Sequence, residues 1–130
     1  MTTIVIRDVL NMNRVGDEFV LEVPAATLTA RELIERRVQT EVARYNTTRP
    51  EYYRGLVQPR DAEIDLNGYR LRRRRSIDWR EQAAVAVEMF QANGFLLLVD
   101  DVQVDDLDSE IRLRPETTVT FLKLVPLVGG

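Results

Sequence analysis

The last third of the chain begins with Phe95-Leu96-Leu97-Leu98-Val99-Asp100-Asp101-Val102-Gln103-Val104 and ends with Thr118-Val119-Thr120-Phe121-Leu122-Lys123-Leu124-Val125-Pro126-Leu127-Val128-Gly129-Gly130. The apolar run over residues 95–99 predicts a buried strand, and Asp100-Asp101 predicts a turn into a short strand over residues 102–104. The β-branched residues from Thr118 to Leu124 predict a final strand. Because Pro126 has no N–H for a strand ladder, we expect the chain to leave the sheet there as an extended tail.

The first 23 residues predict a hairpin. Residues 3–9 are rich in β-branched side chains, and residues 18–23 alternate between polar and apolar, as the two strands of a half-buried hairpin do. Residues 11–17 carry turn chemistry and are predicted to join the two strands.

A helix is predicted to follow and to end near Asn46. Thr29 and Glu32 form a capping box, in which each side chain accepts a backbone N–H at the start of a helix, and Leu28 and Leu33 occupy the hydrophobic-staple positions. The apolar residues that recur at helical spacing, and that we expect to face the sheet, are Ile34, Val38, Val42 and Tyr45.

Residues 47–77 predict an ordered loop and a second hairpin, and a second helix follows them. The hairpin is centred on Asn67-Gly68, a strong two-residue turn signal. The helix is predicted to start at Asp78, with Glu81 completing a second capping box, and to stop at Asn93-Gly94, where Gly94 suits a left-handed cap. Its apolar stripe is Trp79, Ala83, Ala86, Val87 and Phe90. Nearer the C-terminus, residues 107–110 predict a single tight helical turn.

Composition narrows the function classes. With 130 residues, 45% hydrophobic, 30% charged and a net charge of −3, the chain is typical of one soluble domain. The absence of cysteine and histidine from the sequence excludes disulfides, Cys or His metal sites and Ser–His or Cys–His nucleophile pairs. We therefore expect no enzyme activity and no cofactor. The sequence shows no bilayer-length apolar run and no signal-peptide pattern, so we expect a cytoplasmic protein.

The order of predicted elements is that of the β-grasp fold, an α+β fold, and residues 1–46 and 95–130 resemble ubiquitin. The resemblance implies a single ubiquitin-like domain over residues 1–130, with a mixed sheet, a capped helix across it, an inserted hairpin and helix at about 47–94, and a C-terminal tail at 125–130. Residues 63–93 also predict a hairpin followed by a helix, so that unit is the alternative source of the β-grasp. We prefer residues 1–46 because their strands are longer and their capping signals stronger.

The resemblance implies a bacterial ubiquitin-like modifier. An ATP-dependent E1-like enzyme would activate the carboxylate of Gly130, with Gly129 giving clearance beside it. An E2-like enzyme would conjugate it to a target protein, and a protease would remove it. The apolar tail residues proposed for recognition, Leu124, Pro126, Leu127 and Val128, resemble those of bacterial sulfur carriers, which form a C-terminal thiocarboxylate. The alternatives are such a carrier or a non-covalent ubiquitin-like adaptor.

Three further features concern partners and acceptor groups. The basic run Arg70, Arg72, Arg73, Arg74 and Arg75 is either a patch for an acidic partner or a solvated arm paired with nearby acidic residues. It lacks an aromatic ladder, so we expect no nucleic-acid partner, and we expect no membrane partner. The aspartates over residues 100–108 are either a cation site or solvated turns, and their spacing is not that of an EF-hand. Lysine occurs once, at Lys123 in the predicted final strand.

Overall fold

The computed structural model describes residues 2–11, 14–60, 62–65, 68–71 and 75–123, and the chain folds as an α+β protein. Its contacts divide it into two compact units. The first contains Met1–Leu33 and Met89–Pro126, and the second contains Ile34–Glu88. Helix α1 (Ala30–Thr48) begins in the first unit and continues into the second. Extension of the described part to a single domain over residues 1–130 stays a prediction.

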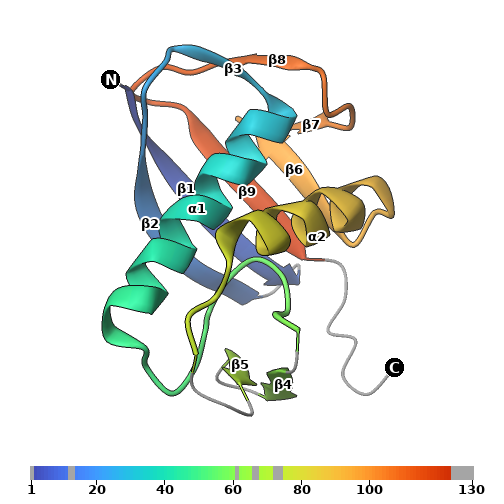
Figure 1. Ribbon diagram of the computed structural model, residues 1–130. Coiled ribbons are helices and arrows are strands. Elements are labelled where there is room, and N and C mark those ends of the chain that lie inside the picture. The colour runs from blue at the N-terminus through green and yellow to red at the C-terminus, as the bar shows by residue number, and fades with distance from the viewer. Residues whose placement is uncertain (1, 12–13, 61, 66–67, 72–74, 124–130) are drawn as a thin grey trace. The chain divides into compact units, whose positions relative to one another are not determined.

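A five-stranded mixed sheet forms the first unit, with the strand order β2-β1-β9-β6-β7 (Figure 1). Strand β1 pairs antiparallel with β2 and parallel with β9, and β9 pairs antiparallel with β6. The first and last strands are therefore neighbours in the middle of the sheet, which is a β-grasp-like arrangement. The strands are β1 (Thr2–Asn11), β2 (Arg14–Val23), β6 (Phe95–Val99), β7 (Val102–Val104) and β9 (Thr118–Lys123).

The N-terminal hairpin is the one that joins this sheet. Strands β4 (Ala62–Asp65) and β5 (Gly68–Leu71) instead form a separate two-stranded sheet in the second unit. The register pairs Asp65 with Gly68, so a hairpin forms in this segment, but Gly68 is the first residue of β5 and not a central turn residue as predicted. Its φ of 128° is one that residues with a side chain rarely adopt. The choice of residues 1–46 over residues 63–93 as the β-grasp hairpin and helix is confirmed.

The start of α1 confirms the capping box. The Thr29 N–H donates to Glu32 Oε1 at 3.1 Å, and the Glu32 N–H donates to Thr29 Oγ1 at 3.1 Å. Two more N–H groups of the first turn, on Ala30 and Arg31, donate to the carbonyl oxygens of Ser109 and Leu107, each at 3.0 Å. The loop over residues 105–109 therefore satisfies helix donors that the helix cannot pair itself.

That loop and the strands beside it differ from the prediction. Residues 107–110 are not a helical turn: Leu107 and Asp108 form a turn in which the Ser109 N–H donates to Asp106 O at 3.1 Å. Glu110 opens β8 (Glu110–Arg112), which pairs with β3 (Thr27–Thr29). This two-stranded ladder was not predicted, because each strand has three residues and the partners lie far apart in sequence.

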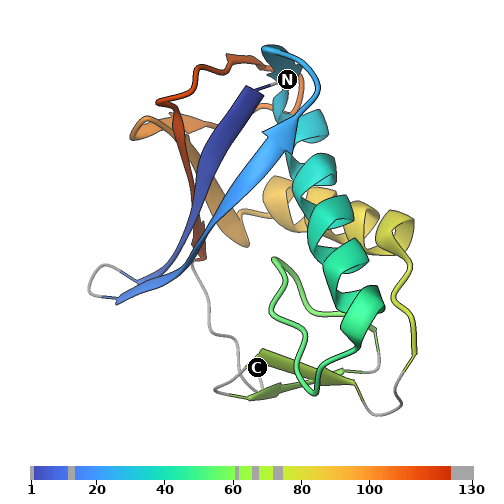
Figure 2. The same cartoon turned by 90° about the vertical axis from the view of Figure 1, so that its left-hand side faces the viewer.

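The turn predicted over residues 11–17 is mostly strand. Strand β1 extends to Asn11 and β2 begins at Arg14, so the two strands extend past the expected boundary, as the long pair in Figure 2 shows. Register shifts between Arg7 and Val9 and between Val9 and Asn11 absorb the irregular spacing. Turn chemistry in this segment is accommodated by a β-bulge or similar irregularity inside the ladder rather than by a long loop.

Helix α2 (Trp79–Gln91) is followed by a left-handed residue, and that residue is Asn93 and not Gly94 as predicted. Asn93 has a φ of 61°, and its N–H donates to Phe90 O at 3.1 Å, while the Gly94 N–H donates to Met89 O at 2.7 Å. These two bonds form a Schellman motif with Asn93 in the left-handed position. Asparagine can adopt this conformation, so the glycine is not needed for it.

The predicted apolar stripes are buried, with one exception. In α1, Ile34, Val38, Val42 and Tyr45 are all at most 5% exposed. In α2 the buried members are Ala83, Ala86, Val87 and Phe90. Trp79 is only half-buried, and the Arg80 guanidinium lies 4.8 Å from its ring centroid, so the expectation of a core tryptophan was wrong.

Three phenylalanines pack against one another in the first unit. The ring centroids of Phe90 and Phe95 are 5.9 Å apart, and those of Phe95 and Phe121 are 5.7 Å apart.

Replacing Asn93 tests the helix end. Asn93→Ala places a Cβ-bearing residue without a local hydrogen-bonding side chain at positive φ and should lower the free energy of unfolding by about 1 kcal/mol. Asn93→Gly should be neutral or stabilising. Urea denaturation followed by circular dichroism measures both. Equal stability of the Ala and Gly variants would contradict the left-handed assignment.

Candidate functional site

The tail residues proposed for conjugation and recognition lie outside the described residues. These are Leu124, Pro126, Leu127, Val128, Gly129 and Gly130. The structure describes the strand that precedes these residues. Strand β9 ends at Lys123, after running between β1 and β6 in the middle of the sheet. The tail therefore begins from a strand that is hydrogen bonded on both sides.

The start of β9 is held by a reciprocal contact with the turn between β6 and β7. The Thr118 N–H donates to Asp100 Oδ1 at 2.9 Å, and the Asp100 N–H donates to Thr118 O at 2.9 Å. Asp100 and Asp101 have φ values of 48° and 68°, as both central residues of a type I′ hairpin turn require. This turn positions the Asp100 carboxylate to fix the entry to the strand.

Two of the five aspartates over residues 100–108 make such local contacts. Besides the Asp100 bond, Asp106 Oδ1 accepts the Asp108 N–H at 2.8 Å. Among the described residues, no group of three or more acidic side chains is placed to hold a metal ion. These two contacts are those of aspartates that accept backbone N–H groups at turns.

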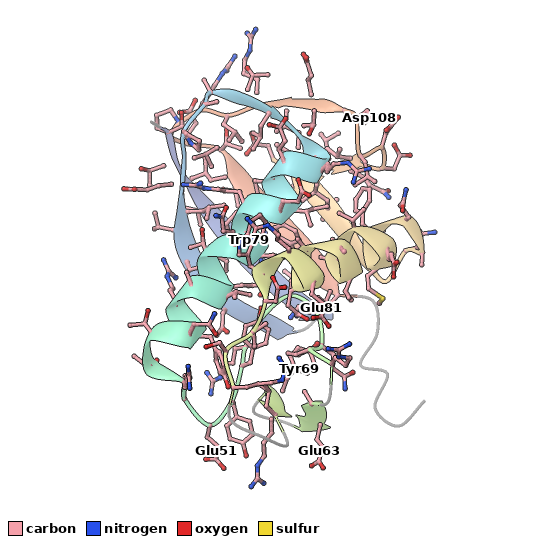
Figure 3. All side chains as sticks on the ribbon, in the orientation of Figure 1. Glu51, Glu63, Tyr69, Trp79, Glu81 and Asp108 are labelled. Atoms are coloured by element: carbon pink, nitrogen blue, oxygen red, sulfur yellow. The ribbon has the colours of Figure 1, made fainter. Side chains whose placement is uncertain are left out.

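The basic run is only partly within the described residues, because Arg72, Arg73 and Arg74 lie outside them. Arg70 is exposed on β5, with Glu63 as its cross-strand neighbour. Figure 3 shows Glu63 and Tyr69 on this hairpin. Arg75 donates to backbone carbonyls, at 2.7 Å to Arg60 O and at 3.2 Å to Ser76 O. Arg75 therefore fastens two segments of the second unit together, whereas Arg70 remains a candidate for partner contact.

A neighbouring arginine outside the basic run, Arg60, pairs with an acidic side chain. Arg60 Nε lies 3.4 Å from Glu81 Oε1, with both side chains well exposed, so the pair contributes little to stability. The Glu81 carboxylate, which the second capping box predicts to bond back to the helix start, therefore pairs with Arg60 instead. The helix start is capped by Asp78, whose Oδ1 accepts the Arg80 N–H at 2.9 Å.

A buried polar cluster in the second unit was not predicted. We call it the Glu41 cluster, and its members are Arg37, Glu41, Tyr53 and Gln82. Arg37 is fully buried and its Nε donates to Glu41 Oε2 at 3.2 Å. Glu41 Oε1 accepts the Tyr53 hydroxyl at 3.3 Å and the Leu56 N–H at 2.9 Å. One carboxylate thus joins α1 to the loop that follows it.

The cluster extends to α2 through Gln82. This buried side chain donates to Val57 O at 3.1 Å, in the loop that also contains Tyr53. Burial raises the pKa of the Tyr53 hydroxyl well above its ordinary value of 10.0, and the nearby Glu41 carboxylate raises it further. Tyr53 therefore stays protonated as a donor, and the cluster ties three segments together.

A sequence signal for the cluster existed. Arg37 and Glu41 are four residues apart and, with Ile34, Val38, Val42 and Tyr45, they complete the 3–4 spacing of one helix face. The signal was missed because charged residues are normally assigned to the solvent side. Gly55 is explained by the same cluster, since a Cβ there would collide with the Tyr53 ring.

Within the described residues, neither helix has an apolar stretch long enough to cross a bilayer. Comparison of this chain with protein-family models, with curated proteins and with solved structures finds no match.

The first prediction for the Glu41 cluster concerns its carboxylate. Glu41→Ala leaves the Arg37 Nε, the Tyr53 hydroxyl and the Leu56 N–H without this acceptor, and should cost about 3 kcal/mol of unfolding free energy. Glu88→Ala, at an exposed acidic position on α2, is the control and should change stability by less than about 0.5 kcal/mol. Urea denaturation compares them. A Glu41→Ala variant as stable as the control would show that the cluster is not a structural tie.

The second prediction concerns alkaline pH. The folded Tyr53 stays protonated where the unfolded one ionises, so the stability that this group contributes is fully present below pH 10 and is lost as the pH rises further. Between about pH 10.5 and 12 the wild type should lose about 1.4 kcal/mol more per pH unit than Tyr53→Phe. Denaturation curves at a series of pH values measure this difference. Parallel pH profiles for the two proteins would contradict the shift.

Proposed function

We propose that this chain is a ubiquitin-like protein modifier that is conjugated to target proteins through the carboxyl group of Gly130. The observation that carries the proposal is the place of β9. This strand is the parallel neighbour of β1 at the centre of a β-grasp-like sheet, and the seven residues after Lys123 end in Gly129-Gly130. A tail that follows a strand held on both sides is presented from a fixed base.

The chemistry needs partners that supply energy and a thiol. An E1-like enzyme transfers AMP from ATP to the Gly130 carboxylate, which releases pyrophosphate and leaves an acyl adenylate. An enzyme cysteine thiolate then attacks the acyl carbon and AMP departs, giving a thioester that passes to an E2-like enzyme. An amine of the target attacks the thioester, loses a proton and displaces the thiolate, and an amide bond results. A deconjugating protease reverses the attachment by hydrolysis.

Within the chain, the tail composition supports this sequence of steps. Gly129 and Gly130 have no Cβ, so a narrow channel can bring the carboxylate to the nucleotide. Pro126 restricts the φ angle of its own residue, which reduces the entropy that the tail loses on entering the channel. The proposal requires a free carboxylate on Gly130, and it places the activation and conjugation steps in the cytoplasm.

A second candidate is a sulfur carrier. The apolar composition of the tail favours the sulfur-carrier function. Its apolar residues include Leu124, Val125, Leu127 and Val128. Sulfide would then displace AMP from the same adenylate to form a thiocarboxylate on Gly130. The third candidate, a non-covalent adaptor, would use the sheet and exposed arginines such as Arg70. Intact mass separates all three outcomes.

The test incubates the protein with its cognate activating enzyme, ATP and a lysate of its own host, and then measures intact masses. We expect adducts heavier by the mass of a target protein. Deletion of Gly130 should abolish them, because the narrow channel requires the carboxylate at that position. Val125→Ala, which changes the tail and keeps both glycines, is the control and should still form adducts. A product in which sulfur replaces one oxygen supports the carrier, and unmodified protein in every reaction contradicts both covalent functions.

A further inference from the structure

Lys123 is the one lysine among the 18 basic residues of this chain. The other 17 are arginines, whose guanidinium groups stay protonated and do not serve as amine nucleophiles. In the reaction proposed above, the acceptor is an amine. A copy of the protein that is already attached to a target therefore offers a second copy a single side-chain acceptor, Lys123.

The sheet places Lys123 unfavourably for that role. Lys123 is the last residue of β9 and pairs with Phe95 of β6. Because side chains alternate along a strand, Lys123 leaves the sheet on the same face as Val119 and Phe121, which are both fully buried. Phe95 beside it is 3% exposed. Lys123 therefore stands at the end of β9 on the buried face of the sheet.

Burial and contacts agree with this placement. Lys123 is half-buried and is engaged in an interaction within the molecule. To attack a thioester, its amine would have to lose a proton, leave that interaction and extend away from the sheet. Each of these changes costs free energy before the reaction begins.

Proximity to the tail adds a steric obstacle. Gly130 is the seventh residue after Lys123, and seven residue steps span at most about 25 Å when the chain is fully extended. On an attached copy, Lys123 is therefore held within that distance of the target surface. A conjugating enzyme that carries a second copy would have to enter this space to reach the amine.

From these observations we propose that the modifier is attached as a single unit and that no chains are built on Lys123. The inference rests on the proposed function and extends it to the regulation of the same site. Each target residue would then be either unmodified or attached to one copy of the modifier. One cleavage would remove the modifier from each modified residue.

The test is to map linkages in conjugates from the native host. The full-length protein carries an N-terminal affinity tag, and its conjugates are isolated under denaturing conditions and digested with trypsin. Since Lys123 is the last site for trypsin, each acceptor residue keeps the remnant Leu-Val-Pro-Leu-Val-Gly-Gly. We expect this remnant on residues of other proteins and none on Lys123. A peptide in which Lys123 itself carries the remnant would overturn the inference.

Lys123→Arg provides the matched variant, because it keeps the charge and the strand position and removes the amine. The ladder of adduct masses should be the same as for the wild type. Loss of the heavier adducts from the variant would show that Lys123 carries chains, which overturns the inference and leaves the proposed function standing. Absence of the remnant from every protein would instead overturn the proposed function, and the inference with it.

Discussion

The parallel pairing of β1 with β9 is the constraint on which the first unit depends. It joins Val5 to Thr118 and Val9 to Leu122, so residues more than a hundred positions apart become neighbours in the centre of the sheet. Closing so long a loop costs conformational entropy that only the completed ladders and core repay. Because β6 pairs with the other side of β9, the last strand joins both halves of the sheet. The segment that leads to the tail is thus also the segment that completes the fold.

The second unit depends on a different kind of contact. Arg37 is fully buried beside Glu41, and Glu41 accepts two further donors from the loop that contains Tyr53. Gln82 adds a bond from α2 to the same loop. An ordered loop needs hydrogen-bond partners for its buried backbone groups. Here the Glu41 carboxylate accepts the Leu56 N–H, and the Gln82 amide donates to Val57 O. The Asn46 side chain does the same at Ile77, accepting its N–H at 2.8 Å and donating to its carbonyl at 2.9 Å.

Local chemistry was predicted well from the sequence, and distant pairing was predicted less well. The Thr29–Glu32 box, the hairpin around position 67 and the C-terminal strands follow from signals contained within a few residues. Pairing of β3 with β8 could not be predicted in this way, because three-residue strands carry no usable periodicity. The sequence predicts Gly94 as the left-handed residue after α2, because glycine is the commoner residue there. The hydrogen bonds of the Schellman motif show that Asn93 occupies this position. The Glu41 cluster was missed because burial of a charge depends on partners from other segments.

For the candidate site, the sequence predicts that the C-terminal glycines react, and the structure describes the strand that leads to them. The β-grasp-like sheet, its central last strand and the Asp100 contact that fixes the start of that strand together support a presented tail. In the second unit, Arg75 and the Glu41 cluster hold the segment that follows α1, and Arg70 is exposed among the described residues of the basic run.

The central claim is that Gly130 becomes covalently bonded to another protein. Its most direct test is tandem mass spectrometry of the C-terminal tail, taken from protein isolated from its own host in denaturant while the activating enzyme is expressed. The account predicts fragment ions in which the Gly130 carbonyl is amide-linked to an acceptor residue of a second protein. Recovery of every copy with a free carboxylate on Gly130 would contradict it.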